Sequence, residues 1–187
     1  MSLRALCVFC GSRSGHAPAH AAAARTLGTL LAERGIELVF GGGRVGLMGV
    51  LADAVLARGG RAIGVIPRAL EERELGHQGL TRLHVVGTMH ERKALMAELS
   101  QAFVALPGGF GTLEEICEAI TWTQLGFHPK PCALLDVDGY WGPLAQLFDH
   151  ALAQGFVDAQ ARALVLHEHD PARLLDELDR RVAQERG

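Results

Sequence analysis

The chain has 187 residues, of which 49% are hydrophobic and 21% are charged, and its formal net charge is −3. This length suffices for a full hydrophobic core, so we expect a single domain over residues 1–187. The sequence contains no long basic run and no apolar stretch of membrane-spanning length, which argues against nucleic acid or a membrane as a partner. Because the N-terminus lacks the long apolar segment of a secretion signal, we expect a cytoplasmic protein.

Short apolar runs alternate with helical patterns along the chain. Strands are expected at Leu6–Cys10, Leu38–Phe40, Ala62–Ile66, Leu83–Val86, Phe103–Leu106, Cys132–Leu135 and Ala163–Leu166. Helices are expected at Ala17–Glu33, Gly46–Arg58, Glu91–Ser100, Leu113–Leu125, Pro143–Ala153 and Pro171–Glu185. Strands that are apolar almost throughout are typical of a parallel sheet buried on both faces. The sequence therefore predicts an α/β fold, a Rossmann-like doubly wound parallel sheet with helices on both faces. The charged segment at 68–79 is expected to be a mobile loop.

The cysteines and late histidines do not form a recognisable metal motif. Cys7 and Cys10 are three residues apart in an apolar run, so in a strand their side chains point to opposite faces. We interpret them as buried free thiols in a reducing compartment. The segment His167-Glu168-His169 lacks the spacing of the helical H-E-x-x-H zinc motif, and we interpret it as surface. No metal ion is expected.

The unusual residues of this chain follow its predicted strands. Segments 11–15, 41–46, 87–93 and 107–112 follow the first, second, fourth and fifth strands and are polar or rich in glycine. Ligands of open α/β sheets bind beyond the carboxyl ends of the strands, so these segments should line one rim. From two of them we take Gly42, Gly43, Met89 and Lys93 as substrate-binding candidates.

The segment AFVALPGGFGTLEE at 102–115 reads as a strand, a glycine turn and the start of a helix. Glycines let backbone N–H groups approach a ligand closely, and a helix start offers unpaired donors and a positive dipole end. We therefore expect an anion site formed by Gly108, Gly109, Phe110, Gly111 and Thr112.

Charged residues near this turn have two interpretations. Thr112 and Glu115 fit a capping box, with Thr112 at the N-cap and Glu115 at N3, but Glu115 also fits a catalytic carboxylate beside a phosphate. Arg92 and Lys93 lie at the start of another predicted helix, where cations are unfavourable by roughly 0.3–1 kcal/mol. Either they form a solvated basic pair or one of them contacts a ligand anion.

Gly41, Gly43 and Gly46 match the dinucleotide fingerprint G-x-G-x-x-G. The match follows the second strand rather than the first, and segment 61–68 has no carboxylate for the ribose hydroxyls. Arg68 would suit a 2′-phosphate instead. We favour a mononucleotide or sugar phosphate as the ligand and keep two alternatives, an NADP-dependent enzyme and a non-catalytic module that binds AMP-like nucleotides.

Five segments occur together in this chain: CVFCGS at 7–12, GGGRVGLMG at 41–49, MHERK at 89–93, PGGFGTLEE at 107–115 and TWTQLGFHPKP at 121–131. In this combination the chain resembles the "Lonely guy" family of cytokinin riboside 5′-monophosphate phosphoribohydrolases. Residues 107–115 match the P-G-G-x-G-T-x-x-E motif of that family. The resemblance implies that Arg92 and Glu115 are the catalytic pair and that the glycine turn with Thr112 binds the nucleotide phosphate. Phe110 stands where tyrosine is frequent in the family.

The resemblance also implies an enzymatic activity that needs no cofactor and an oligomeric state. The reaction would be hydrolysis of the N-glycosidic bond of an adenosine 5′-monophosphate, N6-modified or plain, which releases the base and ribose 5-phosphate without a cofactor. The family's older label, possible lysine decarboxylase, would need a lysine that binds pyridoxal phosphate, and the motif supplies none. A homodimer is expected, because Ile116, Ile120, Trp122 and Leu125 spread apolar surface around the helix that follows the turn.

Overall fold

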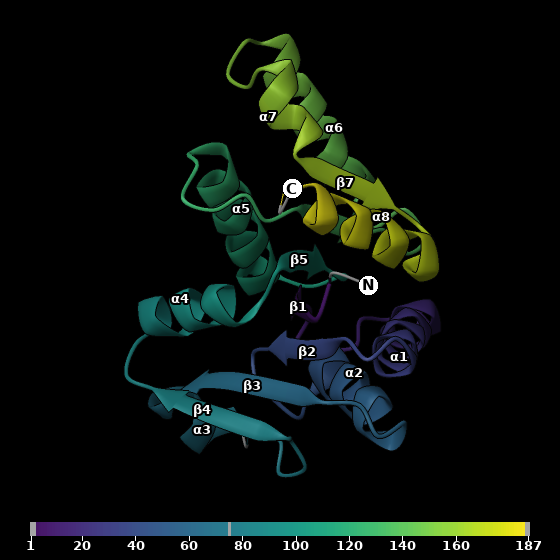
Figure 1. The fold of residues 1–187 in the computed structure, drawn as a ribbon, viewed down its shortest axis with the longest axis vertical. Helices are drawn as coiled ribbons and strands as arrows, with labels where there is room; N and C mark the ends of the chain where they lie inside the picture. The colour runs from purple at the N-terminus through teal and green to yellow at the C-terminus, as the bar shows by residue number, and fades with distance from the viewer. Residues whose placement is uncertain (1–2, 75, 186–187) are drawn as a thin grey trace.

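Seven parallel strands form one sheet in a computed structural model that describes residues 3–74 and 76–185 (Figure 1). The predicted domain 1–187 thus includes five positions, 1–2, 75 and 186–187, that lie outside the described residues. The strands are β1 (Ala5–Phe9), β2 (Glu37–Phe40), β3 (Ala62–Pro67), β4 (Arg82–Val86), β5 (Ala102–Ala105), β6 (Cys132–Leu135) and β7 (Val165–Glu168). Their order is β4-β3-β2-β1-β5-β6-β7, with every neighbouring pair parallel, which confirms the predicted fold class.

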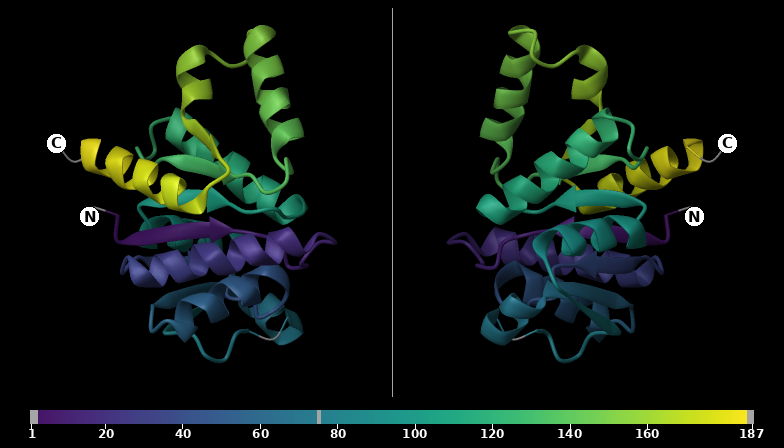
Figure 2. Two further views of the ribbon diagram at one scale, coloured as in Figure 1. Left: turned by 90° about the vertical axis from the view of Figure 1, so that its right-hand side faces the viewer. Right: turned by 90° about the vertical axis from the view of Figure 1, so that its left-hand side faces the viewer.

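The helices connect these strands in the alternation that the sequence predicts. They are α1 (Pro18–Glu33), α2 (Gly46–Ala57), α3 (Arg68–Glu74), α4 (Met89–Leu99), α5 (Phe110–Gln124), α6 (Gly142–Ala153), α7 (Ala159–Ala163) and α8 (Pro171–Gln184). All six predicted helices are present, and none of their ends is shifted by more than three residues. Figure 2 shows α6 and α7 standing together beyond the β7 edge of the sheet, where they contact one another.

Two short helices, α3 and α7, were not predicted. Residues 68–74 form α3 in place of the first part of the expected loop, because arginine and glutamate favour a helix. The side chains of Arg68 and Glu72 in this helix are exposed. The side chain of Asp158 caps α7 by accepting a hydrogen bond of 2.7 Å from the Ala161 N–H. The strand expected from Ala163 therefore begins only at Val165, after this helix.

Alternate residues of each central strand contribute to two hydrophobic cores on opposite faces of the sheet. One core packs against α1, α2 and α8, and the other against α4, α5 and the start of α6. Cys10 belongs to the first core and Cys7 to the second, as the strand spacing predicts, and both thiols are free. The fully buried strands explain why the sequence shows continuous apolar runs rather than alternation.

The chain reverses its direction of progress across the sheet between β1 and β5. It builds β2, β3 and β4 on one side of β1 and then returns to place β5 on the other side. The loops that follow β1 and β5 meet there, and the Gly11 N–H donates a hydrogen bond of 3.1 Å to the Pro107 carbonyl. Such a reversal opens a crevice at the carboxyl ends of the strands, which is where ligands bind in this architecture.

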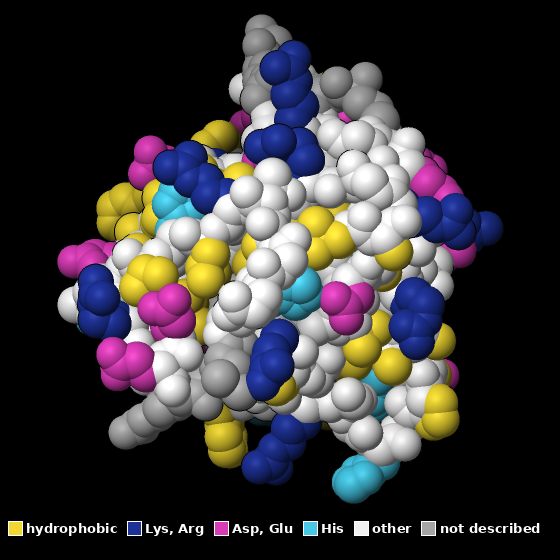
Figure 3. Space-filling model, turned by 90° about the horizontal axis from the view of Figure 1, so that it is seen from below, with side chains coloured by type: hydrophobic (Ala, Val, Ile, Leu, Met, Phe, Trp, Pro, Cys, Tyr) yellow, Lys and Arg dark blue, Asp and Glu magenta, His cyan; other side chains and the backbone are white. Residues whose placement is uncertain are grey.

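Charged side chains are dispersed on the face of the molecule that points downward in Figure 1. Figure 3 shows lysine and arginine side chains spread among acidic, histidine and hydrophobic ones on that face. Among the described residues, no helix combines the length and the apolar character needed to cross a membrane.

Candidate active site

A cavity of about 310 Å³ opens at the carboxyl ends of β1 and β2, beside the start of α5. Its volume is at the lower end of the range for small-molecule sites. Seven of the predicted site residues line it: Met89, Arg92, Gly109, Phe110, Gly111, Thr112 and Glu115. Together with Ser12 and Gly41, which also line the cavity, they bring residues from all four predicted rim segments to one place, next to the carboxylate of Glu115.

Helix α4 positions Arg92 at this cavity. The helix begins with a capping box, in which the Thr88 hydroxyl accepts from the Glu91 N–H at 3.1 Å and the Glu91 carboxylate accepts from the Thr88 N–H at 3.2 Å. One turn along, the Arg92 Nε donates to the Val65 carbonyl at 3.1 Å, and Arg92 Nη1 lies 3.8 Å from the Met89 sulfur. These contacts fix the guanidinium at the carboxyl end of β3.

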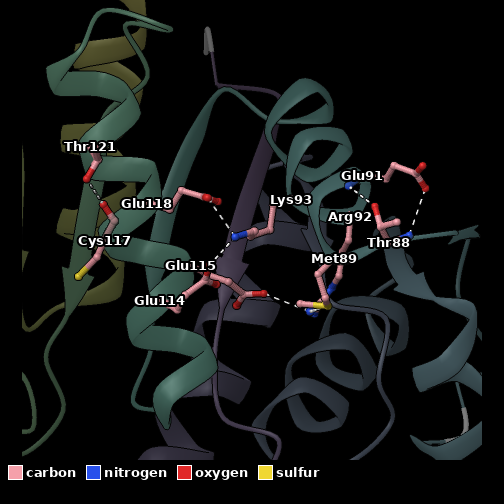
Figure 4. A network of polar contacts seen from close by, with 10 residues as sticks. All are labelled: Thr88, Met89, Glu91, Arg92, Lys93, Glu114, Glu115, Cys117, Glu118 and Thr121. Atoms are coloured by element: carbon pink, nitrogen blue, oxygen red, sulfur yellow. Dashed lines mark hydrogen bonds and ion pairs between the residues drawn. The ribbon is translucent and has the colours of Figure 1, made fainter.

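Arg92 and Glu115 form a buried ion pair between α4 and α5 (Figure 4). The Arg92 Nη1 and Glu115 Oε1 atoms are 3.2 Å apart, and the two side chains are only 12% and 9% exposed. Burial raises the pKa of the Glu115 carboxyl above its ordinary value, although the charge of Arg92 opposes that shift. A carboxylate that is desolvated and held next to a cation is typical of a functional site.

Gly41, at the end of β2, leaves the space that the guanidinium occupies. A Cβ atom on this residue would lie 2.1 Å from Arg92 Nη2 and 3.3 Å from the Met48 sulfur. The glycine is therefore required by the position of Arg92, and any larger residue must displace the guanidinium.

Replacing Gly41 by alanine should lower turnover by about 10²-fold, because a displacement of about 1 Å in a catalytic group can have that effect. The clashing atom is the end of a flexible side chain, so the free energy of unfolding should change by about 1 kcal/mol or less. Gly142→Ala is a matched control, since a Cβ atom there meets nothing within 4 Å. Steady-state kinetics and thermal unfolding of both variants check this, and wild-type turnover in Gly41→Ala would contradict it.

Helix α5 begins earlier than predicted, and this overturns the capping interpretation of Glu115. Gly109 is the N-cap and Phe110 the first helical residue, so Thr112 is at N3 and Glu115 lies three residues further along. No side chain caps this helix start. The backbone N–H groups of its first turn therefore lack acceptors within the helix, and the residues that carry them line the cavity.

The glycine turn packs too tightly for any side chain at Gly108. A Cβ atom there would lie 2.1 Å from the Thr112 hydroxyl oxygen and 2.9 Å from the Gly11 nitrogen. The Gly108 carbonyl accepts a hydrogen bond from the Tyr140 hydroxyl, so the loop before α6 also contacts the turn. Phe110, in contrast, points its ring into solvent and is 92% exposed.

Lys93 does not line the cavity. Its ammonium is buried between the α4 and α5 helices, where it pairs with Glu114 and, at 3.0 Å, with Glu118 (Figure 4). Burial by itself lowers the pKa of this ammonium, but the hydrogen bonds to the two carboxylates outweigh it and the pKa is raised. Lys93 therefore links the two helices that carry Arg92 and Glu115.

Gly42 and Gly43 also lie outside the lining of the cavity. Gly42 contacts β3 near Gly64, and Gly43 forms an isolated antiparallel bridge with Gly76. Their substrate-binding role stays a prediction.

Seven lining residues were not among the predicted site residues: Val8, Phe9, Cys10, Ser12, Gly41, Met48 and Leu70. Ser12 and Gly41 belong to segments that the sequence analysis placed on the rim. Leu70 carries no sequence signal, because its position depends on the unpredicted helix α3. Burial keeps the pKa of the Cys10 thiol well above its ordinary value, so this residue is a thiol rather than a nucleophilic thiolate.

A second hollow, of about 390 Å³, adjoins the first on the other side of Gly109. Both hollows are lined by Ser12 and Gly109, and the second adds Arg13, His20 and Tyr140. The glycine turn therefore separates two neighbouring spaces, of which only the first contains the Arg92–Glu115 pair.

Comparison with known proteins supports a relationship over most of the chain. The sequence model of a family described as "Possible lysine decarboxylase" matches residues 48–178. The chain is 49% identical over 174 residues to a probable cytokinin riboside 5′-monophosphate phosphoribohydrolase of Oryza sativa subsp. japonica, covering 93% of this chain and 78% of the relative. It is 47% identical over 174 residues to a cytokinin riboside 5′-monophosphate phosphoribohydrolase of Arabidopsis thaliana, covering 93% and 80%.

Solved structures show the same fold at lower sequence identity. The molybdenum cofactor carrier protein of Chlamydomonas reinhardtii superposes with a TM-score of 0.73 and 24% identity, covering 97% of this chain and 99% of that one. The molybdenum cofactor binding protein of Rippkaea orientalis gives a TM-score of 0.70 and 22% identity, with 94% of each chain covered. At these identities the likeness concerns the fold alone.

Proposed function

This chain belongs to the family of cytokinin riboside 5′-monophosphate phosphoribohydrolases, and from that membership we propose that it hydrolyses the N-glycosidic bond of adenosine 5′-monophosphates. The products are the free base and ribose 5-phosphate. The observation that carries the proposal is the buried pair of Arg92 and Glu115, which shares one cavity with the open N–H groups at the start of α5.

Glu115 suits a reaction that builds positive charge on the sugar. Cleavage of the glycosidic bond gives the ribose ring oxocarbenium character in the transition state. A carboxylate in a partly desolvated cavity stabilises that charge more strongly than it would in water, and it can also orient or deprotonate the attacking water. We propose these roles for the Glu115 carboxylate.

The start of α5 suits the 5′-phosphate, which is remote from the bond that breaks. Backbone N–H groups and a positive helix end bind a phosphate without any side-chain charge, and Thr112 adds a hydroxyl close to the turn. Binding at this remote group orients the ribose over the carboxylate, so that its free energy contributes to the chemical step. Arg92 keeps Glu115 ionised and in place.

A lysine decarboxylase reaction does not suit the two lysines of this chain. Pyridoxal phosphate requires a lysine amine that is deprotonated and free to form a Schiff base. The Lys93 ammonium is kept charged by two carboxylates, and Lys130 donates to the Ala97 carbonyl away from the cavity that contains Glu115. The residues present do not fit this cofactor, so we assign no such reaction.

The enzyme should cleave AMP or N6-isopentenyl-AMP far faster than the matching nucleosides, because the cavity binds the phosphate through the start of α5. Chromatography of the reactions, with the free base and ribose 5-phosphate quantified, tests this. Equal turnover of AMP and adenosine would remove the phosphate from the mechanism. Comparison of the two monophosphates also reveals the preferred N6 substituent.

Two other functions make different predictions in the same assay. A non-catalytic module would bind AMP without releasing adenine. An NADP-dependent enzyme would bind the dinucleotide through the 41–46 loop and Arg68, which begins α3. Calorimetric titration with AMP and with NADP, alongside the assay for free base, separates both from a hydrolase.

We propose that the protein is a homodimer. Large apolar side chains are exposed on and after α5, with Phe110, Leu125 and Phe127 being 92%, 62% and 73% exposed. Ile116, in contrast, belongs to the core, so the surface available for assembly is smaller than its sequence pattern suggested. Light scattering at micromolar concentration should give a dimer mass, and a monomer mass would contradict the proposal.

We also propose that the protein acts in the cytoplasm. All four cysteines are free, and three of them are buried. Free thiols of this kind are typical of a reducing compartment.

A further inference from the structure

A second cluster of chemically active side chains lies at the carboxyl ends of β6 and β7. Asp136 follows β6, His167 lies in β7 and His169 follows β7. Leu134 pairs with His167 in the parallel register, so a further step of two residues along each strand reaches Asp136 and His169. Side chains two apart on a strand share a face, and therefore all three project to the same side of the sheet.

Asp136 is buried and uses its two oxygens differently. Its Oδ1 accepts a hydrogen bond of 2.9 Å from the Trp141 N–H, which holds the turn before α6. Its Oδ2 faces both imidazoles, with the His167 Nε2 atom at 2.8 Å and the His169 Nδ1 atom at 3.9 Å. The side chain of Asp136 is only 2% exposed, whereas His167 and His169 are 27% and 69% exposed, so the cluster is reached from solvent through the histidines.

We propose that Asp136, His167 and His169 bind a divalent first-row transition metal ion of the zinc type. Imidazole nitrogens and one carboxylate oxygen are ligands that such ions prefer, while magnesium and calcium prefer oxygen ligands alone. One ligand atom from each residue lies within 4.8 Å of the other two. Three protein ligands leave a coordination position for water or a small anion.

The spacing requires only small movements to bind such an ion. Ligands about 2.0–2.1 Å from zinc in a tetrahedral arrangement are about 3.3 Å from one another. The His167–Asp136 contact of 2.8 Å must open by about half an ångström, and the His169–Asp136 distance of 3.9 Å must close by a similar amount. The Trp141 N–H can keep its hold on Oδ1 while Oδ2 binds the ion.

A purely structural hydrogen bond accounts for His167 but not for His169. At 3.9 Å the His169 Nδ1 atom is too far from Asp136 for a hydrogen bond. Its ring centroid nevertheless lies 5.3 Å from that of His167, although most of the His169 side chain is exposed and free to point elsewhere. The two histidines lack the H-E-x-x-H spacing, and their carboxylate neighbour Asp136 is 31 residues away from His167 in the sequence, so no local motif indicates this cluster.

Calorimetric titration with zinc chloride tests the proposal, using protein without a histidine tag, freed of metal by a chelator and kept reduced. We expect one zinc ion per chain and no measurable binding of magnesium. His169→Gln should weaken zinc binding at least about tenfold, because even residues that only support a ligand contribute that much. Asp136→Asn should weaken it similarly while keeping an oxygen acceptor for the Trp141 N–H.

His150→Gln is the matched control, because His150 is an exposed histidine on α6 outside the cluster, and it should bind zinc like the wild type. Circular dichroism verifies that every variant is folded. Wild-type zinc affinity in both His169→Gln and Asp136→Asn, or no zinc binding by the wild-type protein, would overturn the proposal. Cobalt absorption gives an independent readout, with a tetrahedral spectrum expected for the wild type and its loss in His169→Gln.

Discussion

Replacing Glu115 by glutamine should lower turnover by about 10²–10⁴-fold, the usual range for a positioned acid–base group. Glutamine keeps the shape of the side chain but removes the negative charge that faces the sugar in the proposed transition state. AMP should still bind, because the proposed phosphate contacts come from the start of α5 and not from Glu115. Single-turnover assays and AMP titration on one preparation measure both quantities.

The fold should tolerate this substitution. Burial of the Glu115 charge destabilises the folded state through lost solvation, and attraction to Arg92 offsets part of this cost. Removing the charge therefore removes both the cost and the attraction. We expect the free energy of unfolding to change by about 1 kcal/mol or less. Glu114→Gln is a matched control, since Glu114 is half exposed and its partner Lys93 keeps Glu118. Near-wild-type turnover in a folded Glu115→Gln protein would contradict the hydrolytic mechanism.

The pH dependence of stability gives a further check on Glu115. Its pKa is raised in the folded protein, whereas in the unfolded chain it should lie near the ordinary value of about 4.3. Between these values the folded state binds more protons, so ionisation of Glu115 reduces stability as pH rises through that window. Denaturant titrations should therefore show the wild type losing stability relative to Glu115→Gln as pH rises from about 4.

The fold was predictable because its central strands are buried on both faces. Continuous apolar runs such as Cys132–Leu135 leave little choice but a parallel sheet, and that strand was predicted with its observed ends. Helix α3 was missed because its charged residues lack the apolar period of a packed helix. The short α7 was missed because its start depends on the cap from Asp158, which the sequence pattern near Ala163 did not reveal.

The site was predictable where its chemistry depends on local sequence, and not where it depends on contacts between elements. The glycine turn can be predicted from its local sequence. The helix, however, starts at Phe110 rather than after Thr112, so the capping box assigned to Thr112 and Glu115 was wrong. The capping box of α4, formed by Thr88 and Glu91, follows the local T-x-x-E pattern. Gly41 makes room for Arg92 only because β2 packs against α4. No local sequence pattern specifies that contact.

Replacing Arg92 by methionine should reduce turnover at neutral pH by at least about 10²-fold and move the acid limb of the pH profile upward. In the wild type that limb should already lie above the ordinary glutamate pKa, because burial raises the pKa of Glu115. The charge of Arg92 opposes this rise, so its removal should raise the pKa further and leave less of the carboxylate ionised at a given pH. Measuring kcat between about pH 4 and pH 9 reports the position of the limb.

Arg92→Lys separates the charge of this residue from its geometry. Lysine keeps a cation near Glu115, so the acid limb should stay close to that of the wild type. It lacks the planar fork whose Nε donates to the Val65 carbonyl and whose Nη1 reaches Glu115, so turnover should still fall. An Arg92→Met protein with the wild-type pH profile would show that the guanidinium does not control the ionisation of Glu115. The role proposed for Arg92 depends on that control, because a carboxylate buried without its cation would hold a proton at the pH where it must carry charge.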